Sequence, residues 1–165
     1  MRIIAVIAGT AAVLALPISA SAQTRVGVYR GVGEYDLSGV DEAPVTAVRV
    51  TRTVGRLLAL EAGVTHVELD LDSDPNTTLV QPEVQAQLQV PLGSFTPYVG
   101  AGVGAAFARA GSAEDDSDVT LNAGLGLRFN LPFGLGVGVD GRLRSFGTRF
   151  TASGADASVG VSYRF

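Results

Sequence analysis

The sequence contains no cysteine and no lysine among its 165 residues. Without cysteine the chain forms no disulfide, no thiolate metal site, no catalytic thiolate and no lipid-modified N-terminal cysteine. Twelve arginines against 16 acidic residues give a net charge of −4. Because phosphate backbones repel a protein of net negative charge, the composition predicts no nucleic acid partner.

Hydrophobic runs of about 18 residues, which a membrane-spanning helix requires, are also missing. The first 22 residues combine Arg2, an apolar run over residues 3–16 and small residues at 20–22. This pattern predicts a secretory signal peptide over residues 1–22, cleaved before Gln23, rather than an uncleaved anchor helix. The remaining 143 residues carry 11 arginines and 16 acids, so they either fold as a soluble domain or cross a membrane as strands.

Alternation of apolar and polar residues dominates the remaining sequence, and no segment shows a helical period. Each alternating segment has about the 9 to 11 residues that a tilted membrane-spanning strand needs, or slightly more. Residues 23–165 are therefore predicted to form one all-β domain. Its eight predicted strands are residues 25–35, 44–53, 57–68, 78–90, 96–108, 118–130, 135–146 and 155–165.

The connections between these segments alternate in length. Long connections such as "DLSGVDEA", "LDLDSDPNT", "RAGSAEDDS" and "GTRFTASG" follow every odd-numbered strand. Short ones such as "VGR", "PLGSF" and "LPFG" follow strands two, four and six. Outer-membrane barrels have long outer loops and short periplasmic turns, so the order predicts an eight-stranded antiparallel up-and-down transmembrane β-barrel.

The stretch "VQPEVQAQLQV", residues 80–90, shows how the two faces of each strand differ. Valine, proline, alanine and leucine occupy one parity, and glutamine and Glu83 occupy the other. In later strands the polar parity contains many glycines and few charges, unlike a solvated surface crowded with long charged side chains. Because glycine weakens strands, its repetition on one face indicates a narrow lumen. We therefore predict that the glycine-rich face lies inside and the aliphatic face contacts lipid.

The aromatic residues are predicted to form the two interfacial girdles of such a barrel. The predicted periplasmic girdle contains Tyr29, Phe95, Tyr98, Phe129, Phe133, Tyr163 and Phe165. The predicted outer girdle contains Tyr35, Phe107, Phe146 and Phe150. In the first strand the charged parity is placed inward because an arginine in the middle of the bilayer is costly, which turns Tyr29 and Tyr35 outward.

Charged residues on inward parities are predicted to form a network, because an unpaired charge in a dry lumen is very costly. Hairpins centred near residues 55 and 150 would place Arg49 opposite Glu61 and Arg144 opposite Asp156. The network is interpreted as a polar plug, with a gate or narrow ion path as the alternative. Its predicted members are Arg30, Glu34, Arg49, Glu61, Glu83, Arg128, Asp140, Arg142, Arg144, Asp156 and Arg164.

Two further motifs resemble parts of a metal site and a catalytic site. Asp70, Asp72 and Asp74 alternate like the start of a calcium loop, but the glycine and the closing glutamate of that motif are absent. The single histidine, His66, shares the predicted lipid face with Glu68, but no serine follows on that face of the strand. We therefore predict no metal site, no cofactor and no catalytic residues.

The run "FTPYVGAGVG" at residues 95–104 and the terminal "SYRF" resemble the small outer-membrane β-barrel family of opacity proteins and the OmpA-like transmembrane domain. The resemblance implies export to the outer membrane, contact with lipid and lipopolysaccharide, and recognition of Phe165 by the barrel assembly machinery. Some members carry a peptidoglycan-binding domain after the barrel, and because the sequence ends at Phe165 we expect no such tether to the cell wall. The expected function is structural or interactive, by a monomer using its outer loops, with a narrow pore or a lipid-modifying enzyme as alternatives.

Overall fold

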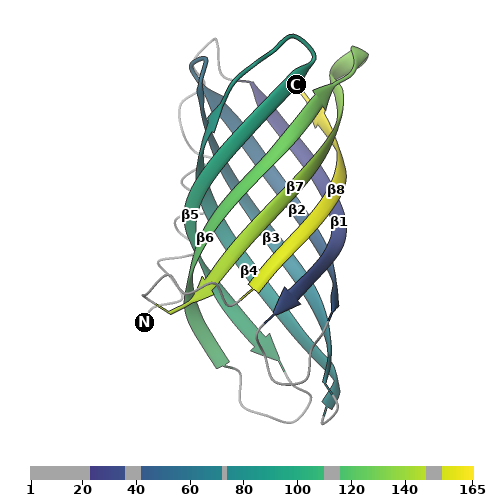
Figure 1. Cartoon of the computed structure of the whole chain (residues 1–165), viewed down its shortest axis with the longest axis vertical. Coiled ribbons are helices and arrows are strands. Elements are labelled where there is room, and N and C mark those ends of the chain that lie inside the picture. Colours follow the sequence, from purple (N-terminus) through teal and green to yellow (C-terminus); the bar gives the residue numbers. More distant parts are fainter. Residues whose placement is uncertain (1–22, 36–41, 72–73, 110–115, 148–153) are drawn as a thin grey trace.

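The structure is a computed structural model that describes residues 23–35, 42–71, 74–109, 116–147 and 154–165. Eight antiparallel strands form a closed barrel in sequence order, and β8 pairs with β1 to complete it (Figure 1). The strands are β1 (Thr24–Tyr35), β2 (Ala43–Val54), β3 (Leu58–Leu71), β4 (Asp74–Gln89), β5 (Phe95–Arg109), β6 (Asp116–Asn130), β7 (Leu135–Phe146) and β8 (Gly154–Arg164). The predicted fold class is therefore confirmed. The predicted signal peptide, residues 1–22, lies outside the described residues.

The strand positions agree with the predicted segments, and the largest difference lies at the β3–β4 hairpin. The sequence predicts a long loop there, but β3 continues to Leu71 and β4 begins at Asp74, with a register irregularity between Leu69 and Leu71. Backbone pairing thus extends beyond the end of the alternating sequence. The short turns include a 3₁₀ turn at Pro132–Gly134 between β6 and β7. No helix among the described residues is long and apolar enough to cross a membrane.

The two faces of the wall are sorted as predicted in most strands. On β4 every odd-numbered residue from Gln81 to Gln89 is buried, whereas Ala86 and Leu88 are exposed. Val99, Leu125 and Val161 on other strands are each more than half exposed on the outer face. These aliphatic side chains form the surface that meets hydrocarbon, because successive residues of a strand point to opposite sides.

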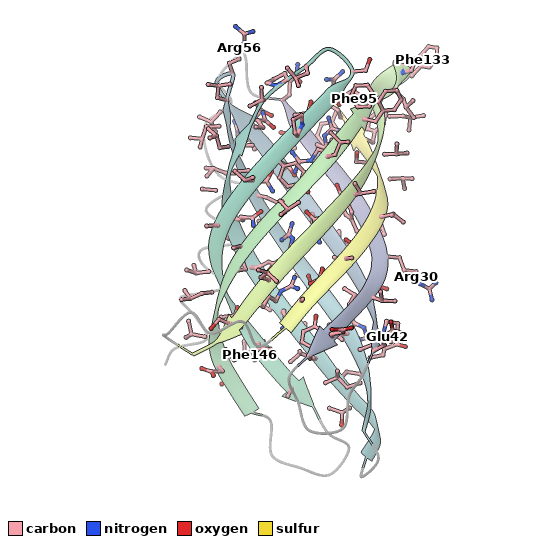
Figure 2. The ribbon with its side chains drawn as sticks, viewed as in Figure 1. Arg30, Glu42, Arg56, Phe95, Phe133 and Phe146 are labelled. Carbon is pink, nitrogen blue, oxygen red and sulfur yellow. The ribbon has the colours of Figure 1, made fainter. Side chains whose placement is uncertain are left out.

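The predicted facing of β1 is wrong. Tyr29 and Tyr35 point inward and are only 4% and 3% exposed, whereas Arg30 and Glu34 are exposed on the outer face. Figure 2 shows Arg30 projecting away from the barrel wall. The prediction considered the cost of an arginine in lipid and ignored the fit of the tyrosine rings inside.

Inward glycines provide that fit. A Cβ atom added to Gly27 would lie 2.9 Å from the ring of Tyr29, and one added to Gly33 would lie 2.9 Å from the ring of Tyr35. Tyr98, also predicted in a girdle, is 4% exposed and lies against Gly126 inside the lumen. The glycines of the inner face therefore make room for three tyrosines. Phe146, predicted in the outer girdle, instead packs against buried apolar side chains at the outer end of the lumen, and Phe150 lies outside the described residues.

The register of two hairpins also differs from the prediction. Arg49 pairs with Gly63, and Glu61 instead pairs with Thr51. The β2–β3 turn includes Gly55 at a φ of 74°, and the hairpin is centred one residue later than predicted. In β7–β8 Arg142, rather than Arg144, pairs with Asp156. In each hairpin the predicted partners are displaced diagonally by two residues, which is still within the reach of arginine side chains.

The outer end of the interior is apolar rather than polar. There the end of β1, the start of β2 and the outer parts of β3, β4 and β5 contribute aliphatic and tyrosine side chains, and Ala108 and Phe146 pack against them. The prediction of a polar interior thus holds for the middle of the barrel but not for this end. The buried members of this cluster, which we call the apolar closure, are Tyr35, Ala43, Val45, Val67, Leu69, Leu79 and Ala106.

Candidate functional site

The middle of the lumen contains four arginines and four acids, all buried. Each is at most 5% exposed, so the group excludes most water and carries no net charge. The side chains come from β2, β3, β4, β6, β7 and β8. We call this group the lumen network, and its members are Arg49, Glu61, Glu83, Arg128, Asp140, Arg142, Arg144 and Asp156.

Arg142 is the centre of the network. Its terminal nitrogens donate to Glu61 Oε1 and Glu83 Oε1, and its Nε donates to Asp140 Oδ1 at 2.9 Å. One guanidinium therefore bridges carboxylates from β3, β4 and β7. Charge-assisted hydrogen bonds of this kind are about twice as strong as neutral ones, so Arg142 cross-links opposite sides of the wall.

Asp140 lies on the side of this centre that faces the short turns. It accepts hydrogen bonds from Arg49 Nη1 at 2.7 Å and from the Tyr98 hydroxyl. The Arg49 guanidinium carbon lies 4.4 Å from the centroid of the Tyr29 ring. The two inward tyrosines therefore support the network, one by donating a hydrogen bond and the other through a cation–π contact.

Glu61 connects the network to neutral polar groups. It accepts from Thr51 Oγ1 at 2.8 Å and from Arg128 Nη2 at 3.2 Å. Arg128 Nη2 also donates to Gln87 Oε1 at 2.6 Å, and its guanidinium carbon lies 3.9 Å from the centroid of the Tyr98 ring. Gln87 of β4 thus bonds a charged residue directly, and its own amide nitrogen donates to Gln85 at 2.9 Å.

Arg144 extends the network towards the apolar closure. Its Nη2 lies 3.3 Å from Glu83 Oε1 and 3.2 Å from Thr65 Oγ1, and its Nη1 forms an ion pair with Asp156. Residues predicted as direct cross-strand partners therefore meet diagonally. The charges compensate one another within a low-dielectric space, and removing any one of them would leave the network with an uncompensated buried charge.

Three predicted members lie outside the network. Arg30 and Glu34 are on the outer face for the reason given above. Arg164 lies at the end of β8, where its Nη1 is 3.5 Å from Gln23 Oε1. The neutral partners Thr51 and Gln87 were not predicted, because only charged residues were assigned to the network, although both lie on inward parities.

The other candidate motifs do not form a site in the structure. The side chains of Asp70, Asp72 and Asp74 lie outside the described residues. His66 lies on the outer face, with Thr46 of β2 opposite it in the register and Glu68 two residues along the strand. No hydrogen bond joins these three described side chains. Among the residues that the structure describes there is no cluster of metal-ligating side chains.

The family model of the outer membrane protein β-barrel domain matches residues 4–165. The chain belongs to this family. Its members are outer-membrane proteins, which agrees with the aliphatic outer face and places the barrel in that membrane. Among curated protein sequences none matches the chain.

Solved barrels show the same fold at low sequence identity. Neisserial surface protein A is 13% identical with a TM-score of 0.68, and the match covers 87% of this chain and 97% of that one. The N-terminal barrel of Pseudomonas aeruginosa OprF is 15% identical with a TM-score of 0.63, covering 88% and 100%. Ail of Yersinia pestis, named as its attachment invasion locus protein, is 14% identical with a TM-score of 0.54, covering 87% and 97%.

Proposed function

We propose that this protein is a non-conducting, non-enzymatic outer-membrane barrel with a structural or surface-interaction role, carried out by its outer loops. The observation that carries the proposal is the filling of the lumen. The lumen network occupies the middle, and the apolar closure occupies the outer end. An eight-stranded barrel is just wide enough for side chains to fill it, so both layers oppose ion passage.

The two layers oppose ions by different means. Passage through the lumen network would require separation of paired charges such as Arg142 and Glu61 in a dry environment. Passage through the apolar closure would require removal of the hydration shell without replacement ligands. The two layers together support a lumen that stays closed to ions. The narrow-pore alternative would need rearrangement of both layers.

The outer loops have the composition of a binding surface. Of the 16 acids, 12 lie in or beside three of the four outer connections, at residues 34–42, 68–74 and 114–118. Lipopolysaccharide is rich in divalent cations, which acidic loops attract. This charge supports contact with lipopolysaccharide through bridging cations, or with a cationic partner at the cell surface.

Conductance measurements test the closed lumen. Single-channel recordings in planar bilayers should show no steady opening for the wild-type barrel. Glu61→Gln removes one carboxylate that holds both Arg128 and Arg142 but leaves the apolar closure in place, so this variant should also show no steady opening. A steady opening of the wild type would refute the closed barrel.

A cell-envelope assay tests the role of the loops. A strain that lacks the protein should become more sensitive to detergent or lose adhesion to surfaces, and the wild-type gene should restore both properties. A variant with Asp70, Asp72 and Asp74 changed to Asn should restore neither fully, although its heat-modifiable band on an unboiled gel shows a folded barrel. Unchanged envelope and adhesion properties in the deletion strain would contradict the proposal.

One observation favours a second candidate, a lipid-modifying enzyme. Thr46 supplies a hydroxyl opposite His66, with Glu68 on the same outer face. The fold is also similar to a structure titled the outer membrane enzyme PagL, with a TM-score of 0.51 and 17% identity. Mass spectrometry of lipid A with and without expression, with His66→Ala as the control, separates the candidates. A change in lipid A that depends on His66 would establish an enzyme.

A further inference from the structure

A polar cavity of about 260 Å³ opens at the end of the barrel that carries the short turns. Its lining includes Gln23 and Arg164 beside the two ends of the barrel domain, and Arg56 in the β2–β3 turn. Figure 2 shows Arg56 at that end of the molecule. Short turns face the periplasm in outer-membrane barrels, so this cavity, which we call the mouth, opens to the periplasm.

The mouth has an excess of positive charge. Four arginines line it, Arg25, Arg56, Arg128 and Arg164, and no aspartate or glutamate is among its lining residues. Only Arg128 has an ion-pair partner in the described part of the chain, namely Glu61 on the inner side. The mouth therefore differs from the lumen network, in which arginines and carboxylates are equal in number.

Arg25 is held by neutral groups. Arg25 donates to Ser162 Oγ at 3.0 Å and to Asn130 Oδ1 at 2.5 Å. A Cβ atom added to Gly136 would lie 2.5 Å from Arg25 Nη1, so the glycine leaves the space that this guanidinium occupies. Arg25 is thus positioned in advance, and its orientation requires no carboxylate.

Such an arrangement favours an anion. Guanidinium groups that converge without a counterion repel one another, and a bound anion relieves that repulsion. Their planar donors match the oxygens of phosphate and carboxylate groups in a bidentate manner. Threonine and amide side chains in the lining, including Thr53, Gln89 and Asn130, add neutral hydrogen-bonding groups.

We propose that the mouth is a binding site for a small multivalent oxyanion, a phosphate or polycarboxylate, presented from the periplasm. The cavity volume suits a compact group of a few oxyanion units rather than a whole polymer chain. The phosphate has two possible sources, a soluble periplasmic compound and the headgroup of a phospholipid in the inner leaflet. The lining comes from the inward faces and turns of the strands, which favours the soluble source.

Calorimetry with pyrophosphate tests the site. The barrel is refolded in an uncharged maltoside detergent without phosphate and titrated at about 0.1 M salt, where exposed charges are screened over about 10 Å. The wild type should release heat with one site per chain. Arg25→Gln with Arg56→Gln should weaken binding by roughly a hundredfold, since each lost charge-assisted contact reduces affinity about tenfold.

Arg30→Gln is the matched control. It removes a positive charge from the outer face and leaves the mouth intact, so its affinity for pyrophosphate should equal that of the wild type. The heat-modifiable band shows that every variant is folded. Absence of binding by the wild type, or an equal loss in Arg30→Gln and the double variant, would overturn the proposal.

A second titration distinguishes the sources. Phosphatidylglycerol mixed into the micelles should leave the pyrophosphate affinity unchanged if the ligand is soluble. The alternative result is that phosphatidylglycerol competes with pyrophosphate in the wild type but not in the double variant with Arg25→Gln and Arg56→Gln. That result would support the same oxyanion site with a lipid headgroup as its ligand. Competition that persists in that variant would place the lipid elsewhere and contradict a headgroup at the mouth.

Discussion

The two ends of the lumen differ in chemistry although one wall encloses both. At the outer end, inward residues such as Val45, Val67 and Leu79 are buried in an apolar cluster. At the periplasmic end, the inward positions hold arginine, threonine and amide side chains around an open cavity. Strand alternation sets which positions point inward. The residue types at each level then decide whether the lumen is closed by apolar side chains, filled by ion pairs or open to water. The lumen network separates the two ends.

The largest expected effect comes from the residue that links the network. Arg142→Met should destabilise the barrel by about 3–5 kcal/mol, because it leaves Glu61, Glu83 and Asp140 without their shared guanidinium. Urea unfolding in lipid vesicles, followed by the heat-modifiable gel band, measures the change. An unchanged urea midpoint would show that the ion pairs of Arg142 do not stabilise the barrel.

The apolar closure should respond to loss of volume. Leu79→Ala should reduce the free energy of unfolding by about 3 kcal/mol, because Leu79 is only 4% exposed and its neighbours surround the cavity left behind. Urea unfolding measures this change as well. Leu88→Ala is the matched control, because it removes the same atoms from a leucine that faces lipid. Equal effects at both positions would mean that the outer end is not closely packed.

A substitution on the outer face should have the opposite sign. Arg30→Val should stabilise the barrel by about 2 kcal/mol, since a charged side chain on the lipid-facing surface is costly. A fall in stability would indicate that the Arg30 side chain makes a favourable contact with a lipid or a protein partner. Vesicles of zwitterionic lipid provide the measurement, because anionic headgroups could neutralise this charge.

The smallest effect is expected at the mouth. Arg164→Gln should change the free energy of unfolding by only about 0.5 kcal/mol, and in the stabilising direction when no anion is present, because it removes one of several like charges. The unfolding midpoint should therefore rise slightly in phosphate-free buffer. A clear loss of stability would mean that Arg164 supports the barrel in the way that Arg142 does.

Particular residues show how far the sequence predicted this structure. The run over residues 80–90 determined which side of β4 faces inward, because its alternation is uninterrupted and lipid accepts only one of the two faces. In β1 the same reasoning failed, since both parities contain residues that are unfavourable in lipid or in the lumen. Only the neighbouring glycines of the closed barrel show that Tyr29 and Tyr35 fit inside.

The sequence by itself determined the number of strands, their antiparallel order and the sorting of aliphatic residues to the outside, because these depend on a local period of two and on transfer to hydrocarbon. Tertiary structure alone decided the register, the diagonal pairing of Arg144 with Asp156, and the presence of four arginines in the lining of the mouth. The turns set the register one hairpin at a time, and closure then brings together side chains from strands far apart in the sequence. Their contacts therefore depend on the shape of the whole barrel.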